Sequence, residues 1–481
     1  MTSGLAIAVA LLSGASLAYE VLLIRLFAIE QFHHFAAMAI SIAMLGFGLS
    51  GTALALADPA AERAREWLAR SSASAAPLLA VSPLLARAIP LDVARIVWDP
   101  AQWPLLAGLY VTLAAPFAAV SLAILLAIRL AVRRPGGLYG ASFIGAALGS
   151  ALTVAVLWLL PADRAVFLPA CAAAAALIIL TRRLRFLLSS LAGAAVAVGC
   201  MLGAGPDARV NPYKGLPQVT AYPEARRVAE RHSPLGWLVA VRAPAFRYAP
   251  GLSLGYAGTF PQQIGLFVDG ENVGAVTDPR GNGADMVGWL PAALPFALGP
   301  RRVAVLGAEG GLDVQMALAH GADSVLAVEF HPGVVELAHR LAPSDAPTPY
   351  ADPRVRVAFG DARATLTRAR RAFDLVMIGS AGRLGSGTGG LQALSEDFGH
   401  TVEAYVLYLR RLAPGGTLAV TQWISLPPRA AVRSILTAAA ALREIGPHAA
   451  ERGLVVAHGW STVAVLARPD GFDDGTISAL R

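Results

Sequence analysis

Apolar residues fill the first 204 positions in long runs, whereas the apolar runs in the rest of the chain are short. A helix needs roughly 20 apolar residues to cross a bilayer core about 30 Å thick. The long runs predict spans at 4–24, 35–57, 75–97, 104–128, 138–160, 164–180 and 184–204. The third run contains Pro83, Arg87, Pro90, Asp92 and Arg95, so the pattern leaves open whether it spans, re-enters or lies at the interface. Residues 1–204 are therefore expected to form a transmembrane helical domain of six or seven spans.

The rest of the chain shows three successive patterns. Residues 205–235 contain five prolines and no strong periodicity, which is typical of a linker. Residues 236–300 hold short β-type runs and an Asp269-Gly270 turn, which predict a small β-rich domain. From 301 to 481, strand-like runs alternate with helical segments, and this alternation predicts a mostly parallel sheet covered on both faces.

Composition supports this division. The chain is 56% hydrophobic and 15% charged, against about 25% charged in ordinary soluble proteins. Residues 1–204 contain 8 acidic and 13 basic side chains, whereas residues 205–481 contain 24 and 26. Five of the seven net positive charges thus lie in the apolar part, where arginine in short loops is an orientation signal, so nucleic acid is not expected as a partner. The expected partner of this part is the lipid bilayer, with a multi-pass location in the cell membrane.

The arginines raise a conflict about membrane side. They cluster after the second, fourth and sixth runs at Arg63, Arg65, Arg70, Arg129, Arg133, Arg134, Arg182, Arg183 and Arg185. With seven spans these loops share one side, which the positive-inside tendency assigns to the cytoplasm, and the C-terminal domain would then lie outside. An enzyme that uses a cytosolic nucleoside is expected inside, so the sequence leaves the side of this domain open. Ser16-Leu17-Ala18 would suit signal-peptide cleavage, but the first run lacks a basic start and more apolar sequence follows.

Other polar residues in the apolar part carry little chemistry. Glu20 and Arg25 lie near the end of the first run, within reach of the headgroups. His33 and His34 are adjacent on a helix and point in different directions, so they suit an interface better than a shared metal ion. Cys171 and Cys200 lie far apart in apolar runs and offer neither a disulfide framework nor a metal-ligand spacing. No metal is expected.

Polar motifs follow three successive strands of the predicted parallel sheet. Gly307, Gly310 and Gly311 form a glycine-rich turn that opens a helix and lets the backbone approach a ligand. Glu329 ends the second strand, 22 residues beyond Gly307, where a carboxylate can accept hydrogen bonds from both ribose hydroxyls. Asp361, followed by Ala362, ends the third strand and could accept from an adenine amino group. Because ligands bind beyond the carboxyl ends of such strands, this pattern predicts a nucleoside site.

A larger set of ordered segments carries a resemblance: Tyr19-Glu20 with Arg25, Ser233 to Gly236, Pro250 to Leu254, Leu266 to Gly270, Gly307 to Val314, Glu329, Gly360 to Ala362, Ala393 to Glu396, Thr401 to Tyr405 and Leu412 to Gly416. With these segments the chain resembles the spermidine/spermine synthase family, and most closely its membrane-fused bacterial branch. The resemblance implies a small β-domain before a methyltransferase-like Rossmann domain and decarboxylated S-adenosylmethionine as co-substrate. It also implies transfer of an aminopropyl group to a diamine with release of methylthioadenosine, and a possible homodimer.

The sequence departs from the family where the chemistry is expected. In the glycine-rich turn, Gly310 stands where the family has an aspartate, and Glu309 or Asp313 could replace it. After the fourth strand the family has carboxylates that bind and deprotonate the attacking amine, whereas this chain reads Gly379-Ser380-Ala381-Gly382. The polyamine-holding Tyr-His-Glu segment has no match, and the region reads Gly283 to Gly288. The resemblance therefore implies nucleoside binding by Gly307, Glu309, Gly310, Gly311, Asp313, Glu329, Asp361 and Ala362.

Other acids could take over the catalytic role. Asp285, Glu396 and Glu403 are the candidates, and the loop 379–396, with six glycines, could act as a lid that gathers such acids, Asp269, Glu271 and Asp397 among them. An amine must lose a proton before it attacks, so a pocket poor in acids is an objection to this chemistry. Two other functions stay open: a methyltransferase that uses intact S-adenosylmethionine, and a sensor or transport-associated protein that binds a nucleoside or polyamine without turnover.

Overall fold

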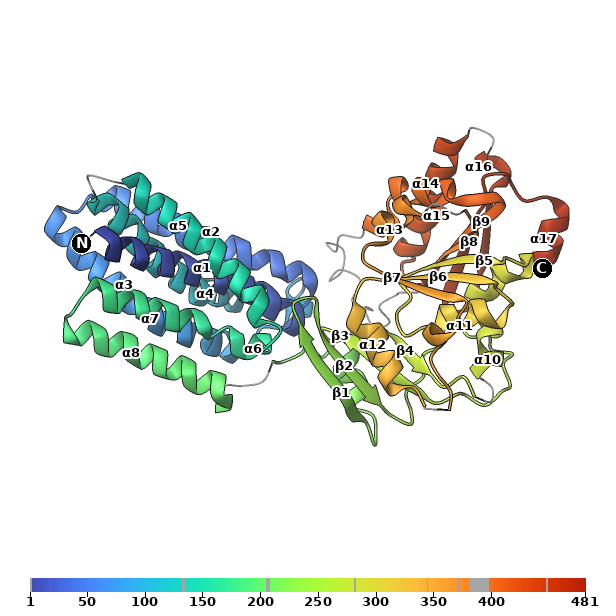
Figure 1. Ribbon diagram of the computed structural model, residues 1–481, viewed down its shortest axis with the longest axis horizontal. Coiled ribbons are helices and arrows are strands. Elements are labelled where there is room, and N and C mark those ends of the chain that lie inside the picture. The colour runs from blue at the N-terminus through green and yellow to red at the C-terminus, as the bar shows by residue number, and fades with distance from the viewer. Residues whose placement is uncertain are drawn as a thin grey trace. The chain divides into compact units, whose positions relative to one another are not determined.

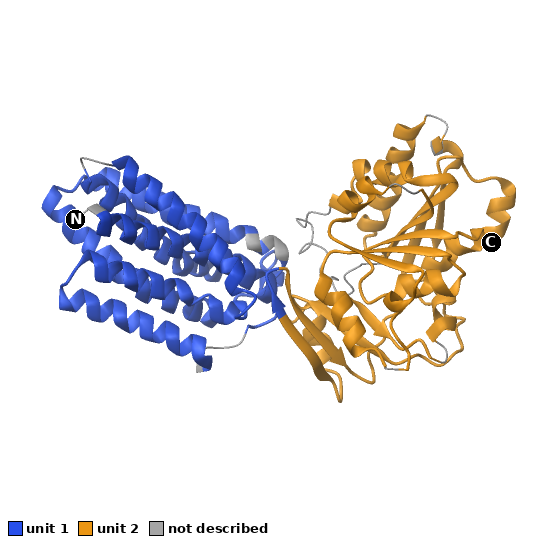
Figure 2. Cartoon of the chain, in the orientation of Figure 1, with its two compact units in different colours: residues 1–211, 232–234 blue, residues 212–231, 235–481 orange. Residues whose placement is uncertain are grey.

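Long helices build the first 204 residues of the computed structural model, which describes residues 2–131, 135–204, 208–280, 283–343, 345–369, 372–379, 398–446 and 449–481 (Figure 1). The helices are α1 (Thr2–Glu30), α2 (His33–Ala57), α3 (Ala61–Ala88), α4 (Gln102–Leu130), α5 (Pro135–Val156), α6 (Ala162–Ala165), α7 (Leu168–Leu180) and α8 (Leu184–Gly199). Two short helical turns, η1 (Val93–Arg95) and η2 (Cys200–Ala204), complete this part. The chain divides into two units, residues 1–211 with 232–234 and residues 212–231 with 235–481 (Figure 2).

Within the described residues, six helical segments are long and apolar enough to cross a membrane: Ser3–Glu30, Ala37–Ala57, Gln102–Leu130, Pro135–Val156, Ala162–Leu180 and Leu184–Gly203. They correspond to six of the seven expected runs. The remaining run, the third, was expected at 75–97 and is corrected: α3 begins at Ala61 and ends at Ala88, so Arg63, Arg65 and Arg70 lie on a helix and not in a loop. The chain leaves the helix at the Ile89-Pro90 step, because a residue before proline disfavours helical backbone.

The contacts of α3 place it inside the helical bundle. It packs against α4, α7 and α8. Its buried face consists mostly of small residues, such as Ser72, Ala76 and Ala80. At α8, a Cβ on Gly193 would meet the backbone of Pro77 at 2.4 Å, so only glycine permits this approach. Small residues that let helix backbones come close are typical of helix packing in membranes.

Contacts between helices fix their directions. Tyr19 on α1 hydrogen-bonds Ser82 on α3 at 2.7 Å, and Glu30 pairs with Arg87 at 2.9 Å, so α1 and α3 run parallel. Helices α1 and α5 are also parallel, because Ala10 contacts Gly145 and Gly14 contacts Gly149. Helices α3 and α8 are parallel as well, because Ala73 contacts Ser189 and Pro77 contacts Gly193. By contrast, the start of α1 meets the end of α7, through Gly4 and Ile179. Thus α1, α3, α5 and α8 share one direction, and α7 runs in the other.

Unit 2 begins with a four-stranded antiparallel sheet in the order β1-β2-β3-β4. Its strands are β1 (Arg226–Ser233), β2 (Gly236–Arg242), β3 (Gln263–Val268) and β4 (Glu271–Thr277). The expected turn is confirmed: Asp269 and Gly270 have φ of 51° and 83°, and the Asp269 carboxylate accepts from the Trp237 N–H at 2.8 Å.

The linker expected at 205–235 instead contains α9 (Gly215–Thr220) and β1. The sequence of β1, Arg-Arg-Val-Ala-Glu-Arg-His-Ser, is that of a charged, exposed edge strand and has no apolar alternation to reveal it.

A seven-stranded sheet in the order β10-β11-β9-β8-β5-β6-β7 forms the centre of unit 2. Its strands are β5 (Arg302–Leu306), β6 (Ser324–Glu329), β7 (Val355–Phe359), β8 (Phe373–Ile378), β9 (Leu412–Trp423), β10 (Leu454–His458) and β11 (Thr462–Ala467). The pairs among β7, β6, β5, β8 and β9 are parallel, and β11 lies antiparallel between β9 and β10. The predicted mostly parallel α/β sheet is confirmed. The chain order reverses between β5 and β8, which is where ligands bind in such sheets.

Helices cover both faces of this sheet, as Figure 1 shows with α13 to α15 on one side and α10 and α11 on the other. The helices of unit 2 after α9 are α10 (Gly283–Met286), η3 (Val287–Trp289), η4 (Pro291–Leu298), α11 (Leu312–Ala319), α12 (Pro332–Leu341), η5 (Pro349–Ala351), α13 (Ala362–Arg368), η6 (Phe398–His400), α14 (Val402–Arg410), α15 (Arg429–Ile445), α16 (Ala449–Arg452) and α17 (Asp474–Leu480). On one face of β5, the side chains of Ala304 and Leu306 pack in the core with Tyr405 and Leu442. Alternate side chains of a strand point to opposite faces, so both faces are apolar and buried.

Candidate functional site

The predicted glycine-rich turn lies at the carboxyl end of β5 and leads into α11. Gly307 and Gly311 have φ of 75° and 93°, a backbone conformation that favours glycine. Glu309 also has a positive φ, 49°, although it carries a side chain. A left-handed residue other than glycine costs of order 1 to 3 kcal/mol and persists only where its surroundings hold it.

Two buried side chains hold this turn. Glu329, at the end of β6, accepts from the backbone N–H groups of Glu309 and His331, both at 2.8 Å. The Tyr350 hydroxyl lies 2.8 Å from the carbonyl oxygen of Ala308 and 2.6 Å from that of Glu309. Glu329 is 6% exposed, and burial raises its pKa although backbone N–H groups oppose this. The carboxylate predicted to bind ribose therefore also fixes the turn, and it accepts a further backbone hydrogen bond from Phe330.

Asp361 lies at the same edge of the sheet, beyond β7. Glu329 pairs with Phe359 in the β6–β7 ladder, so the two strands end side by side. Asp361 is exposed, and its side chain accepts from the Ala364 N–H at 2.8 Å, which makes it the N-cap of the helix that begins at Ala362. The structure therefore brings the glycine-rich turn, Glu329 and Asp361 to successive strand ends at one edge. Nucleoside binding by these residues stays a prediction.

Asp313 is in the first turn of α11, opposite the end of β8. An ideal Cβ on Gly379 would fall 2.0 Å from Asp313 Oδ2, so the carboxylate occupies the space that a side chain at 379 would need. Asp313 makes no hydrogen bond or ion pair with any residue in the described part of the chain. Burial raises the pKa of its carboxyl to about 6. Asp313 thus places a carboxylate at the strand end where the sequence has no acid of its own.

The β4 strand closes the other side of the turn. A Cβ on Gly310 would lie 2.2 Å from the carbonyl oxygen of Ala275, so no aspartate can stand at this position. Next to this contact is a small cavity of about 10 Å³, lined by Tyr248, Gly274, Ala275, Gly307, Ala308, Glu309, Gly310, Leu312 and Asp313. It has room for about one water molecule. The cavity is too small for a nucleoside, but a single amino group has about the size of a water molecule.

The two predicted catalytic acids in the described part of the chain, Asp285 and Glu403, do not line this cavity. Asp285 is exposed on α10, and its charge acts on Tyr256, whose ring packs edge-on against Trp289 at 6.0 Å. Glu403 is exposed in the first turn of α14, where hydrogen bonds from its own backbone N–H and from Thr401 lower its pKa. Glu396, together with most of the loop 379–396, lies outside the described residues.

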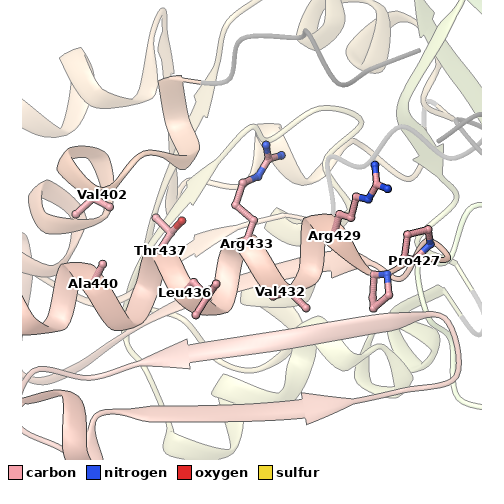
Figure 3. A pocket seen from close by; sticks show the side chains of 9 residues that line it. Val402, Pro427, Arg429, Val432, Arg433, Leu436, Thr437 and Ala440 are labelled. Carbon is pink, nitrogen blue, oxygen red and sulfur yellow. The ribbon is translucent and has the colours of Figure 1, made fainter. Parts of the chain in front are cut away.

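A separate hollow of about 660 Å³ runs along α15 (Figure 3). It is lined by Val402, Pro427, Pro428, Arg429, Val432, Arg433, Leu436, Thr437 and Ala440. Arg429 and Arg433 extend from the same side of the helix in Figure 3. None of the residues that the sequence singles out for nucleoside binding lines this hollow. Among the described residues, no group of three or more His, Cys, Asp or Glu side chains is arranged to hold a metal ion.

Comparisons with known proteins give likenesses to solved structures. No protein-family profile and no curated protein sequence matches this chain. Spermidine synthase from Thermotoga maritima is 14% identical, covers 53% of this chain and 75% of its own, and has a TM-score of 0.37. A probable spermidine synthase from Corynebacterium glutamicum is 15% identical over 54% of this chain and 86% of its own, with a TM-score of 0.35. Human methyltransferase-like protein 13 in complex with SAH is 14% identical over 39% of this chain and 85% of its own, with a TM-score of 0.27. At such identities the likeness concerns the arrangement of strands and helices and not the role of any residue.

Two residues of the site escape sequence reasoning. Tyr350 comes from the short helix η5, and Tyr248 from the irregular segment after β2, where its hydroxyl lies 3.5 Å from Glu309 Oε2. Neither stands at a strand end or in a motif. The approach of Asp313 to Gly379 joins positions 66 residues apart, and only the parallel pairing of β5 with β8 brings them together.

Proposed function

We propose that the chain is a membrane-anchored transferase that binds an S-adenosylmethionine-type nucleoside at the carboxyl edge of β5, β6 and β7. The observation that carries this proposal is Glu329, a buried carboxylate at the end of β6 that holds the glycine-rich turn, in the place where a carboxylate can accept from ribose hydroxyls. Asp361 lies at the neighbouring strand end, in reach of the base. The sulfonium end would then lie over the turn, toward Asp313 and Gly379.

The favoured reaction is transfer of the aminopropyl group of decarboxylated S-adenosylmethionine to an amine such as a polyamine. The nucleoside supplies a sulfonium, an alkylating group that needs no further activation. The protein must orient the donor, admit an uncharged amine and exclude water, since only a deprotonated amine has a lone pair for attack. The resemblance of the sequence and the edge built by Glu329 and Asp361 support this assignment.

Unit 1 is proposed to span the membrane, with α3 as a seventh crossing beside the six apolar helices. The supporting observations are the parallel contacts of α3 with α1 and α8 and its burial among α4, α7 and α8. A 28-residue helix at 1.5 Å per residue is longer than the hydrocarbon core of a bilayer.

The test is mass-spectrometric detection of methylthioadenosine when the full-length protein meets decarboxylated S-adenosylmethionine and putrescine. Glu329→Gln is expected to lower nucleoside affinity about 10- to 100-fold, because hydrogen bonds to a charged group contribute about 1.5 to 3 kcal/mol. Glu336→Gln is the matched control, since Glu336 is exposed on α12 and pairs with Arg231. Undiminished affinity in Glu329→Gln would refute the nucleoside site.

The same assay separates the other functions. Methyl transfer with intact S-adenosylmethionine, in place of aminopropyl transfer, would make the chain a methyltransferase. Binding without turnover of either donor would make unit 2 a sensor or a regulator of the membrane bundle. The run Gly379-Ser380-Ala381-Gly382, which has no acid, is the observation that keeps the sensor as the second candidate.

A further inference from the structure

We infer that Asp313 is the carboxylate that binds the acceptor amine and takes its proton. It would replace the acids that the resembled family has after the strand corresponding to β8. This inference rests on the proposed function and names the missing base of that reaction. Asp313 belongs to α11, which follows β5, yet its carboxylate fills the space beside Gly379 at the end of β8. These two strand ends flank the point where the order of the sheet reverses, and reacting groups gather there in such folds.

The surroundings of Asp313 leave it available for a ligand. No side chain or backbone group of the described residues donates a hydrogen bond to it, whereas Asp361, Asp374 and Asp473 all accept backbone N–H groups. A half-buried carboxylate without such partners is costly, and a cationic ligand would remove this cost. The adjoining cavity has room for one amino group, and an ammonium would supply the donors that Asp313 lacks.

The charges around Asp313 favour a cation there. Glu309 from the turn, Glu329 from the end of β6 and Asp313 itself all raise the pKa of Tyr350. Tyr248 contributes a hydroxyl to the cavity wall. No arginine, lysine or histidine lines the cavity among the described residues. The pocket is therefore anionic, and burial, which raises the pKa of Asp313 to about 6, makes its carboxylate a better proton acceptor than an exposed one.

The step balances with these groups alone. Asp313 takes one proton from the ammonium of the acceptor and frees the nitrogen lone pair. That pair forms a bond to the methylene carbon attached to the sulfonium sulfur. The carbon–sulfur bond breaks, and its electrons return to sulfur, which leaves neutral methylthioadenosine and a secondary ammonium. The proton on Asp313 passes to water when the products leave.

The first experiment compares Asp313→Asn with wild-type full-length protein and with Asp323→Asn, a matched control on an exposed turn where Asp323 pairs with Arg301. At saturating nucleoside, Asp313→Asn is expected to lower kcat by about 100- to 10,000-fold, the usual contribution of a general base. The wild-type rate is expected to fall below about pH 6, and this limb of the pH profile should be absent in Asp313→Asn. Turnover of Asp313→Asn within threefold of wild type would overturn the inference.

A relocation variant tests the geometry. Asp313→Ala combined with Gly379→Asp moves the carboxylate across the same gap, because the two positions compete for one space. We expect the turnover rate of this double variant to be at least tenfold higher than that of Asp313→Ala. A double variant no faster than Asp313→Ala, although its nucleoside affinity is intact, would contradict a role for the carboxylate at this place.

Amine binding tests the inference even if wild-type protein turns nothing over. Calorimetry would follow putrescine, with 1,4-butanediol as uncharged control, added to the protein saturated with methylthioadenosine. Putrescine binding that weakens at least tenfold in Asp313→Asn supports the amine site, even where the proposed transfer itself fails. No putrescine binding to the wild type, or equal binding to both proteins, overturns the inference, whereas failure to bind methylthioadenosine refutes the proposed function.

Discussion

The two units bury opposite kinds of surface. In unit 1, large apolar side chains such as Met44, Phe143 and Leu152 are 69%, 62% and 63% exposed, while glycine and alanine make the helix contacts. In the central strands β5 and β8 of unit 2, the large apolar residues are buried, as Val305 and Leu375 illustrate. Lipid tails are as apolar as leucine, so in a bilayer close packing of small residues, and not burial of leucine, holds helices together. The two surfaces suit two solvents, a bilayer for unit 1 and water for unit 2.

Helix termini differ in the same way. In unit 1, α2, α3, α4, α6, α7 and α8 have no side-chain hydrogen bond at the N-cap. In unit 2, α12, α13, α14 and α17 are capped by the side chains of His331, Asp361, Thr401 and Asp473, whereas α9, α11 and α15 have no such bond. Short helices in water are marginal without such caps. Long helices in a bilayer keep their backbone hydrogen bonds without caps, because the hydrocarbon offers no alternative partner.

The largest expected effect is an all-or-none labelling pattern across the membrane. Single cysteines replace Arg65, Arg183 and Arg481, all exposed, in a background without Cys171 and Cys200. If α3 crosses, positions 65 and 183 share one side and position 481 lies on the other. With α3 outside the membrane, 65 would share the side of 481. An impermeant maleimide applied to intact cells separates the two patterns.

The arginine-rich ends near 65 and 183 predict that position 481 is the one labelled from outside. Such labelling would place unit 2 away from cytosolic nucleosides and favour the sensor function over a cytosolic transferase. Protection of 481, with labelling at 65 and 183, would show that the positive-inside tendency fails here and would favour the transferase.

The next effect concerns packing inside unit 1. A Cβ on Gly145 would meet the Ala10 carbonyl oxygen at 2.1 Å, and backbone cannot yield as a side chain can. Gly145→Leu should therefore separate α1 from α5 and lower stability by about 3 kcal/mol, the upper part of the usual range for overpacking. Gly140→Leu on the same helix is the control, since nothing lies within 4 Å of its Cβ. Thermal unfolding in detergent measures both, and equal stability of the two variants would refute the close helix contact.

The sequence predicted those parts of the fold whose pattern is local. Strand runs, the Asp269-Gly270 turn and the acids at strand ends all follow from neighbouring residues. The strand β1 was missed because charged side chains cover an edge strand, and α3 was placed too late because its first turns are polar. The space shared by Asp313 and Gly379, like the hold of Tyr350 on the turn, depends on residues far apart in sequence. Such contacts follow from the strand order, which no local pattern encodes.

A third prediction concerns stability and pH in unit 2. Because the folded-state pKa of Asp313 is about 6, above the value of about 3.9 expected when unfolded, the folded protein binds this proton more tightly. Ionisation of Asp313 therefore costs stability, with no cost below about pH 4 and the full cost above about pH 6. Asp313→Asn should raise the unfolding free energy of unit 2 by on the order of 2 kcal/mol at pH 8 and leave it unchanged near pH 4.

A purely structural aspartate would give the opposite result, since its removal would destabilise the fold at pH 8. Urea unfolding of wild type and Asp313→Asn at the two pH values decides between them. Asp323→Asn again serves as control and should change stability little at either pH, because its pair with Arg301 is exposed.

The smallest effect separates the two roles of Asp361, as a cap and as a candidate adenine contact. Asp361→Ala and Thr401→Ala each remove an N-cap and should each cost about 1 kcal/mol of stability. Asp361→Asn should keep the cap, because asparagine caps helices as well as aspartate does. If Asp361 contacts the adenine, only Asp361→Ala weakens nucleoside binding, whereas Thr401→Ala, with the same loss of stability, does not. Equal affinity in these two variants would leave Asp361 with the cap alone, and the base would then be held by other residues of the edge.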